Sequence, residues 1–239
     1  MTKHLFNKMQ ALLAGLGICL LASCGLYDID VDELNEVATD FSLGRDTVYV
    51  MQGERFVFNP VFVPDTLSNV QVFYQSTDDD VALMVGDTVV AQTEGWATIK
   101  AISVSSRLTD SCRVCVLPLW QPTLEYYPYE TVFYARVTVK GRPLDEDMLI
   151  AAFCGEELRG IGQLYEQKGV RCLRLRVGAE ALDVAEDPDD PEGPYVVYRE
   201  RIEFRCYDRR THNLYTSPTH VSFDGETHGT PSHLFELNL

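Results

Sequence analysis

Positively charged side chains are scarce in this sequence. Its 239 residues include 20 lysines and arginines against 36 aspartates and glutamates, which gives a formal net charge of −16. A surface this acidic repels the phosphate backbone of nucleic acids, so the composition argues against a DNA- or RNA-binding function. It also repels anionic lipid headgroups, so contact with a membrane requires an anchor of another kind.

Catalytic signatures are also missing. The sequence contains no Gly-x-Ser-x-Gly motif and no glycine-rich phosphate loop. A catalytic carboxylate pair cannot be recognised among so many acids. We therefore expect no enzymatic activity, no catalytic residues and no cofactor. An enzyme of unknown class stays open as the last alternative for the function.

The apolar run at residues 11–21 is too short to span a bilayer as a helix. It follows Lys3 and Lys8 and ends in Leu21-Ala22-Ser23-Cys24. A basic start, a short apolar stretch and a small residue before a cysteine are typical of bacterial lipoprotein precursors. The sequence therefore predicts a signal peptide over residues 1–23 and a diacylglycerol on the sulfur of Cys24, which anchors the chain to a membrane.

Residues 24–40 alternate acidic and apolar side chains and leave no room for a packed core. We interpret this segment as a linker that lifts the folded part off the membrane. An acidic stretch directly behind the lipidated cysteine resembles the export signal of Bacteroidota lipoproteins, which implies the outer face of the outer membrane. The alternative is a plain solvated linker that faces the periplasm.

Cysteines are few once Cys19 in the signal peptide and Cys24 are set aside. An odd number remains, so at least one thiol is free, and the pairing of the others stays open. The spacing of Cys112 and Cys115 matches redox and zinc motifs, but residues three apart on a strand point to opposite faces, and no second ligand pair follows. We predict that they are small buried or half-buried residues. The remaining cysteines are Cys112, Cys115, Cys154, Cys172 and Cys206.

Nearly every patterned segment alternates with a period of two, and turn residues separate the segments. This spacing is typical of a sandwich of two antiparallel sheets. In residues 95–101 the alternation directs Ala97, Ile99 and Ala101 inward and leaves Trp96 on the outer face. The expected strands of this first domain, residues 41–117, lie at 47–51, 56–58, 70–74, 97–101 and 112–116.

Within this domain, residues 72–82 resemble a stretch of the bacterial Ig-like domains of group 2, with phenylalanine or tyrosine in place of the family's usual tryptophan. Residues 86–91 and 95–101 are similar to that family's Gly-x-Val-x-Ala and Gly-x-Ala-x-Ile-x-Ala ending. The resemblance covers about residues 44–117. It implies a small sandwich that serves as a spacer or adhesion module and carries no catalytic residues.

Prolines at 118 and 122 end the first unit, and a second alternating series follows over residues 119–239. The fold class we predict is all-β, with two β-sandwich domains in tandem. Residues 151–160 and 202–208 resemble a β-domain of secreted and surface proteins of Bacteroidota, to which no settled activity belongs. In it, Gly155 permits a tight hairpin and Gly160 permits a bulge or a close approach.

Arginines alternate outward on two expected strands of the second domain. Arg174 and Arg176 share one outer face, and Arg201 and Arg205 share another. If these strands pair, four guanidinium groups line one surface of an acidic protein. Carboxylates such as Glu203 can satisfy them, and an anionic ligand is the alternative.

Aromatic side chains gather at the junction of the two domains. Flat aromatic faces stack on sugar rings, so a ligand-binding site for glycans is one hypothesis for them. Packing of the tryptophans in the interface between the domains is the other, and we favour it. The candidate ligand-binding residues are Trp96, Trp120, Tyr126, Tyr127 and Tyr129.

Acidic clusters at residues 78–80, 145–147 and 183–192 could supply calcium ligands, but no EF-hand spacing is present, and we expect solvated loops. We therefore predict no metal site. The function that it favours is a non-catalytic surface lipoprotein for adhesion, binding or assembly, with an extracellular glycan or protein as partner. The alternative is a glycan-binding accessory lipoprotein of a polysaccharide-uptake system.

Overall fold

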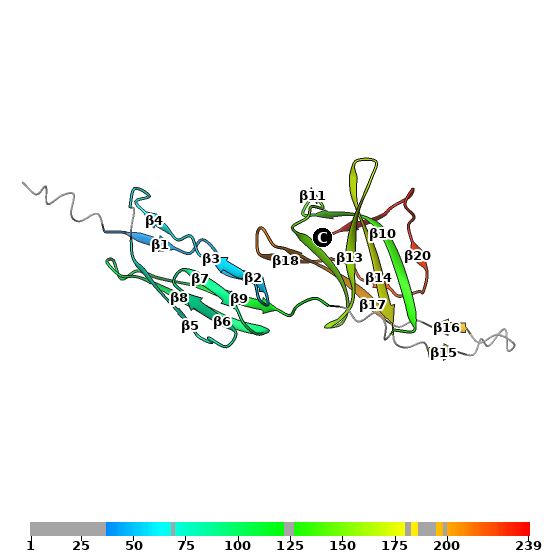
Figure 1. The fold of residues 1–239 in the computed structure, drawn as a ribbon, viewed down its shortest axis with the longest axis horizontal. Coiled ribbons are helices and arrows are strands. Elements are labelled where there is room, and N and C mark those ends of the chain that lie inside the picture. Colours follow the sequence, from blue (N-terminus) through cyan, green and yellow to red (C-terminus); the bar gives the residue numbers. More distant parts are fainter. Residues whose placement is uncertain (1–36, 68–69, 122–126, 180–182, 186–194, 198–199) are drawn as a thin grey trace, which may run out of the picture.

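The strands of this chain pair in two separate groups. The computed structural model describes residues 37–67, 70–121, 127–179, 183–185, 195–197 and 200–239. In this part of the chain, strands up to residue 117 pair with one another, and strands from residue 129 onward do the same. Figure 1 shows the two groups as two bodies placed end to end. The described residues form no helix, and so none that could cross a membrane. The all-β fold class is confirmed.

The first sandwich packs two sheets, ordered β2-β9-β8-β5 and β3-β7-β6, beside the short pair β1-β4. All these strands pair antiparallel except β2 and β9, which pair parallel. The alternation in β8 buries Ala97, Ile99 and Ala101 and exposes Trp96, as predicted. The strands are β1 (Asp40–Ser42), β2 (Thr47–Met51), β3 (Arg55–Val57), β4 (Val61–Val63), β5 (Val72–Ser76), β6 (Ala82–Val85), β7 (Thr88–Ala91), β8 (Gly95–Ser103) and β9 (Thr109–Leu117).

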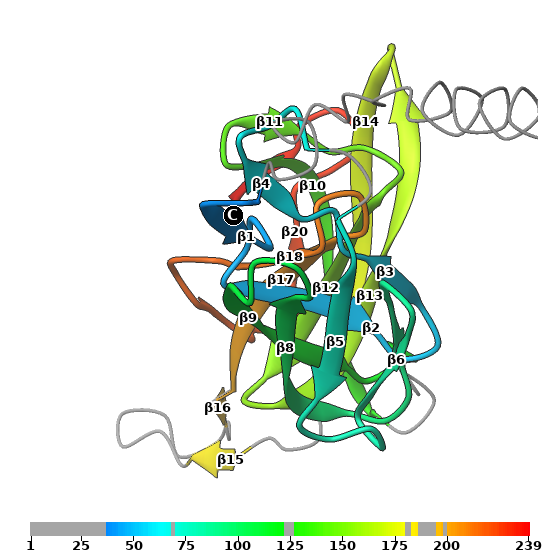
Figure 2. The ribbon, with the colours of Figure 1, turned by 90° about the vertical axis from the view of Figure 1, so that its left-hand side faces the viewer.

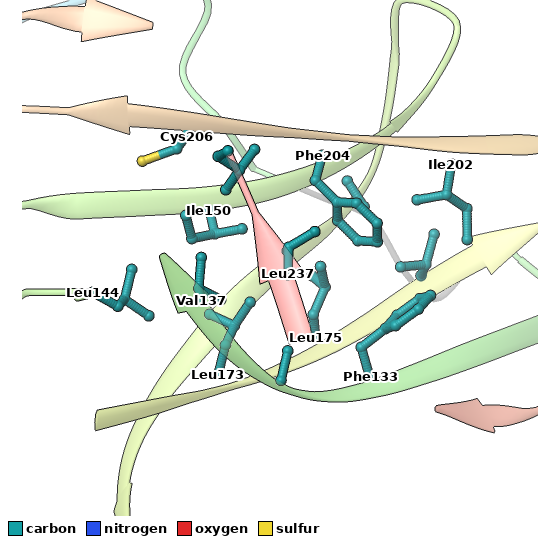
Figure 3. Packing of buried hydrophobic residues seen from close by; sticks show 14 of the residues in the cluster. Phe133, Val137, Leu144, Ile150, Leu173, Leu175, Ile202, Phe204, Cys206 and Leu237 are labelled. Carbon is teal, nitrogen blue, oxygen red and sulfur yellow. The ribbon is translucent and has the colours of Figure 1, made fainter. Parts of the chain in front are cut away.

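The second sandwich is one strongly curved sheet with the order β11-β10-β14-β13-β12-β17-β18, and β19, β20 and β21 pair at its sides. Its two halves fold over a core that includes Phe133, Leu175 and Phe204 (Figure 3). The strands are β10 (Tyr129–Val139), β11 (Arg142–Pro143), β12 (Met148–Cys154), β13 (Glu157–Gln167), β14 (Val170–Ala179), β15 (Asp183–Ala185), β16 (Tyr195–Val197), β17 (Arg201–Asp208), β18 (Asn213–Thr216), β19 (Val221–Ser222), β20 (Thr227–His228) and β21 (Phe235–Asn238). The separate pair β15-β16 stands outside this sheet.

The strand β13 crosses from one half of this sandwich to the other. Its first residues pair with β12 and its later ones with β14. At the crossing, a Cβ on Gly160 would lie 2.0 Å from the carbonyl oxygen of Arg176, and one on Gly162 would lie 2.3 Å from Leu173. Gly155, at a φ of 62°, sits in the β12-β13 turn. The hairpin and the close approach predicted from Gly155 and Gly160 are therefore both confirmed.

The two strands that carry the four arginines, β14 and β17, do not pair with each other, because β13 and β12 lie between them. The single arginine surface that such a pairing would create is therefore not formed. Each of two arginines instead has its own carboxylates. Arg176 Nε donates to Glu130 over 2.8 Å, and Arg205 pairs with Glu203 and Glu156.

The five cysteines of the described chain are free thiols. Cys112 lies in the core of the first sandwich, and Cys115 points to the opposite face, as the strand spacing predicts. Burial raises the pKa of the Cys112 and Cys115 thiols to about 11, so their reactive thiolates are disfavoured at neutral pH.

Candidate functional site

The two sandwiches meet at an apolar cluster, which we call the junction. Trp120, in the connection between them, is only 8% exposed. Its ring centroid lies 5.6 Å from that of Phe153 on β12 and 6.5 Å from that of Tyr207 on β17. Six buried residues form the cluster: Met51, Leu117, Trp120, Ala151, Phe153 and Tyr207.

The continuous apolar run of β12 is explained by the junction. Ile150 and Ala152 face the core of the second sandwich, whereas Ala151 and Phe153 face the junction. Both faces of this strand are therefore buried, and a strand buried on both faces shows no alternation of polar and apolar residues.

Hydrogen bonds border the apolar cluster. The backbone N–H of Tyr49 donates to the carbonyl oxygen of His212 over 2.9 Å. The Tyr207 hydroxyl donates to Glu54 over 2.8 Å, and Arg209 Nε donates to the same carboxylate over 3.0 Å. Arg45 also donates to the Thr211 carbonyl oxygen. The turn between β17 and β18 is thus fastened to the first sandwich by both backbone and side-chain contacts.

Burial sets the protonation of the groups in this border. Burial, together with the Glu54 carboxylate, raises the pKa of Tyr207 well above its usual range, so its hydroxyl remains a donor. Burial also lowers the pKa of His212, although the Tyr49 carbonyl and Glu54 act in the opposite direction. Nδ1 of His212 lies 3.2 Å from the Tyr207 hydroxyl oxygen and 3.3 Å from the Tyr49 carbonyl oxygen. Because the Tyr207 hydroxyl donates to Glu54, both oxygens are acceptors here, and a hydrogen on Nδ1 suits them.

The turn itself is organised by Asp208, whose side chain is completely buried. Burial opposes its ionisation, but hydrogen bonds from Arg142 and Thr211 prevail and lower its pKa. Arg142 donates over 2.7 Å, and the backbone N–H groups of Arg210 and Thr211 each donate over 3.1 Å. This carboxylate therefore has a structural role.

A cleft of about 470 Å³ opens beside the junction. Trp96 lies on its wall and is 47% exposed. The Arg113 guanidinium covers the Trp96 ring at 4.3 Å from its centroid, and Tyr49 meets the ring edge-on at 6.0 Å. Arg205 covers Phe153 in the same way, also at 4.3 Å. The cleft thus offers aromatic surface and guanidinium groups, a combination suited to the flat face of a polar ring.

The structure brings two of the predicted ligand-binding residues together. Trp96 and Trp120 both line the cleft, whereas its described lining includes neither Tyr127 nor Tyr129. Packing in the interface is confirmed for Trp120, and Trp96 keeps an open face. Tyr126 and the predicted lipid site Cys24 lie outside the described residues.

Tyr127 is engaged elsewhere in the second sandwich. Its hydroxyl donates to Glu157 over 2.6 Å, and the Arg159 guanidinium lies 4.7 Å from its ring centroid. Its ring also fills the space above Gly178, where an added Cβ would meet it at 2.4 Å. Tyr129 begins β10 at an exposed position.

The acidic turn at residues 78–80 binds its own backbone. Asp78 Oδ1 accepts from the N–H groups of Asp80 and Val81, over 3.1 and 3.3 Å. In the part of the chain that the structure describes, no group of three or more histidine, cysteine or acidic side chains is arranged to hold a metal ion. The cluster at residues 183–192 lies largely outside that part.

Comparisons with known proteins identify no family for this chain. No family model and no curated protein matches the sequence. Solved structures with some likeness include domains 4–9 of the surface layer protein SbsC, at 13% identity and a TM-score of 0.30, covering 82% of this chain and 32% of that one. Another is the extracellular cadherin domains 1–4 of protocadherin gamma B7, at 11% identity and a TM-score of 0.25, covering 76% and 48%. This chain spans about a third of the SbsC fragment, and similarity at this level supports no argument about function.

Proposed function

We propose that this chain is a non-catalytic module for binding or assembly at the cell surface, anchored to the outer membrane through a lipid on Cys24. The junction is the observation that supports this role. An apolar cluster with a hydrogen-bonded border makes the two sandwiches one stiff arm, since bending it would expose Trp120 and Phe153 to water. A stiff arm behind a short linker holds a binding surface at a fixed distance from the membrane.

The chemistry of the junction also favours a structural role over a catalytic one. His212, Glu54 and Tyr207 are the kinds of group that transfer protons in enzymes. Here each is occupied by partners from across the junction, and the pKa of Tyr207 is far above neutrality. Their arrangement serves docking rather than proton transfer at pH 7.

The anchor is tested by replacing Cys24→Ala in the full chain. We expect the wild type to incorporate labelled palmitate, to partition into detergent and to be removed from intact cells by external protease. The variant should lose the label and the partitioning. Retention of both in the variant would exclude lipidation at Cys24, and protection of the wild type from protease would place the chain on the periplasmic face.

The stiffness of the arm is tested separately by small-angle X-ray scattering of the full chain. The lipid is released first, so that the chain can be measured without detergent. A single extended shape is expected for the wild type, and a broader distribution of shapes for Trp120→Ala. The matched control is Trp96→Ala, because that side chain lies outside the junction cluster. If the distribution of shapes were already as broad for the wild type as for Trp120→Ala, the proposal of a stiff arm would be wrong.

A second candidate function is glycan binding in the cleft, as expected of an accessory to polysaccharide uptake. The observation in its favour is the exposed face of Trp96 on the wall of a 470 Å³ cleft. Neutral oligosaccharides should then quench or shift tryptophan fluorescence with saturation, and Trp96→Ala should abolish the response. No saturable change with a broad glycan panel would exclude this cleft as a glycan site.

A further inference from the structure

A second hollow lies on the outer face of β10, β13 and β14, and we call it the groove. Its volume is about 450 Å³, within the range of roughly 300–1,000 Å³ that is typical of small-molecule sites. The β13-β14 hairpin that forms one wall projects beyond the rest of the second sandwich in Figures 1 and 2. Its polar lining consists of Tyr134, Gln163, Tyr165, Glu166, Gln167 and Arg174. Glu166 and Arg174 form no ion pair with each other in the described part of the chain, so the groove presents a carboxylate as well as a guanidinium.

Strand register brings these side chains together. Tyr134 on β10 and Gln163 on β13 are the direct neighbours of Arg174 on β14, on either side of it. Residues opposite one another in adjacent strands share a face, so the three form a row across the sheet. The Arg174 guanidinium lies 6.0 Å from the Tyr134 ring centroid, and the Tyr165 ring meets Tyr134 edge-on at 6.4 Å.

Three polar atoms of residues that line the groove are shielded from solvent and lack a hydrogen bond of normal geometry within the described residues. They are Arg174 Nε, Gln167 Oε1 and the Tyr165 hydroxyl oxygen. Such atoms are rare in folded proteins and cost stability. The three side chains are only half-buried, so each still reaches the surface of the groove.

Arg174 also differs from the arginine two residues further along the strand. Arg176 is paired with Glu130, whereas Arg174 forms no ion pair with a carboxylate in the described part of the chain. The chain has 36 acidic residues and a net charge of −16. An arginine left without a carboxylate in such a protein is available for an external anion.

We infer that the groove binds a hydroxylated carboxylate, namely the uronic-acid unit of an acidic glycan. The planar guanidinium of Arg174 matches a carboxylate in charge and geometry. The amides of Gln163 and Gln167 both donate and accept, as sugar hydroxyls do. The rings of Tyr134 and Tyr165 provide the flat apolar surface on which a sugar ring stacks.

Neither the sugar ring nor the carboxylate alone provides a partner for every polar group in the groove. A neutral sugar leaves Arg174 without a counter-charge, and a simple carboxylate has no hydroxyl to donate to Gln167 Oε1. A neighbouring hollow shares Gln167 and Pro231 with the groove and adds Lys168, whereas its Arg136 is already paired with Glu236 over 3.3 Å. Longer acidic oligomers should therefore bind more tightly than the single sugar.

The groove is lined by none of the cleft residues, so this inference holds or fails independently of the surface anchor and of the cleft. The experiment is calorimetric titration of the full chain with trigalacturonate, galacturonate, galactotriose and glutarate. We expect saturable binding of trigalacturonate, weaker binding of galacturonate, and at least about tenfold weaker binding of galactotriose, which lacks the carboxylate that Arg174 would bind. Glutarate should also bind at least about tenfold more weakly, because it has no hydroxyls for the glutamines and no sugar ring to stack on the tyrosines.

The variant Arg174→Gln should weaken trigalacturonate binding by at least about tenfold, and Arg174→Lys should restore part of it. Arg176→Gln is the matched control, on the same strand and face, and should bind as the wild type does. Circular dichroism confirms folding of each variant. If galactotriose bound as tightly as trigalacturonate, the role of the carboxylate would be overturned. If glutarate bound as tightly as trigalacturonate, the role of the hydroxyls would be overturned. Absence of binding, or binding unaffected by Arg174→Gln, would overturn the site.

Discussion

The junction and the groove are built from the same kinds of side chain but differ in how their polar atoms are satisfied. In the junction, Tyr207, Glu54 and Arg209 bond to one another across the two sandwiches. In the groove, Arg174 and Gln167 contain shielded atoms without a partner. Paired polar groups stabilise a fold, whereas unpaired ones weaken it. The junction border has one shielded atom of this kind, Thr211 Oγ1, against three in residues that line the groove. We therefore interpret the junction as a structural contact and the groove as a ligand site.

The largest effect should come from Trp120→Ala at the centre of the junction. Emptying a buried aromatic site costs about 3–5 kcal/mol of unfolding free energy, and Trp120 is 8% exposed among Phe153 and Tyr207. Urea unfolding measures this loss. The neighbouring Leu119, 48% exposed, supplies the control, since Leu119→Ala should stay within about 0.5 kcal/mol of the wild type. If Trp120→Ala lowered the unfolding free energy no more than Leu119→Ala does, the junction would be open in solution.

Two tyrosines compare the regions directly. Tyr207→Phe removes a donor from the half-buried Glu54 carboxylate and should cost about 1–3 kcal/mol. Tyr165→Phe, in the groove, removes a shielded hydroxyl whose side-chain neighbour is the Cys172 thiol, a weak hydrogen-bonding group, and should change stability by less than about 0.5 kcal/mol. The same urea experiment measures both. Equal costs for the two variants would contradict the distinction between the junction and the groove.

The sequence was sufficient for the orientation of strands but not for the contacts between distant ones. Alternation correctly placed Ala97, Ile99 and Ala101 in the core of the first sandwich. Each of these assignments depends on neighbours along the same strand. Alternation also showed that Arg174 faces outward, but only the sheet order separates β14 from β17 and leaves this arginine beside Tyr134.

The junction could not be predicted in the same way. Glu54 and Tyr207 are separated by 153 positions, and neither residue carries a local signal of the other. The one available signal was the unbroken apolar run of β12, which indicates a strand buried on both faces. Trp120 beside two prolines marked the place, and its partners followed only from the three-dimensional arrangement.

The protonation of His212 gives a smaller, pH-dependent effect. Burial lowers its pKa in the folded chain below the unfolded value of about 6.5. The unfolded chain therefore takes up the proton first as the pH falls, and stability is lost below about pH 6.5. Urea midpoints at pH 7.5 and pH 5.5 measure the loss. We expect His212→Gln to reduce it and His220→Gln, at an exposed position, to leave it unchanged; an identical loss in both variants would assign the dependence to other groups.

Among the tryptophan variants, the smaller effect on stability should come from Trp96→Ala on the wall of the cleft. Nearly half of this side chain is exposed, so little burial is lost. What remains is its contact with Arg113 at 4.3 Å, a cation–π interaction that contributes about 0.5–1 kcal/mol at exposed sites. The expected cost in urea unfolding is therefore under about 1 kcal/mol. A cost of about 3 kcal/mol, typical of a buried aromatic, would show that the cleft is closed in solution. Trp96 would then join Trp120 as part of the junction, and its exposed face could no longer support glycan binding in the cleft.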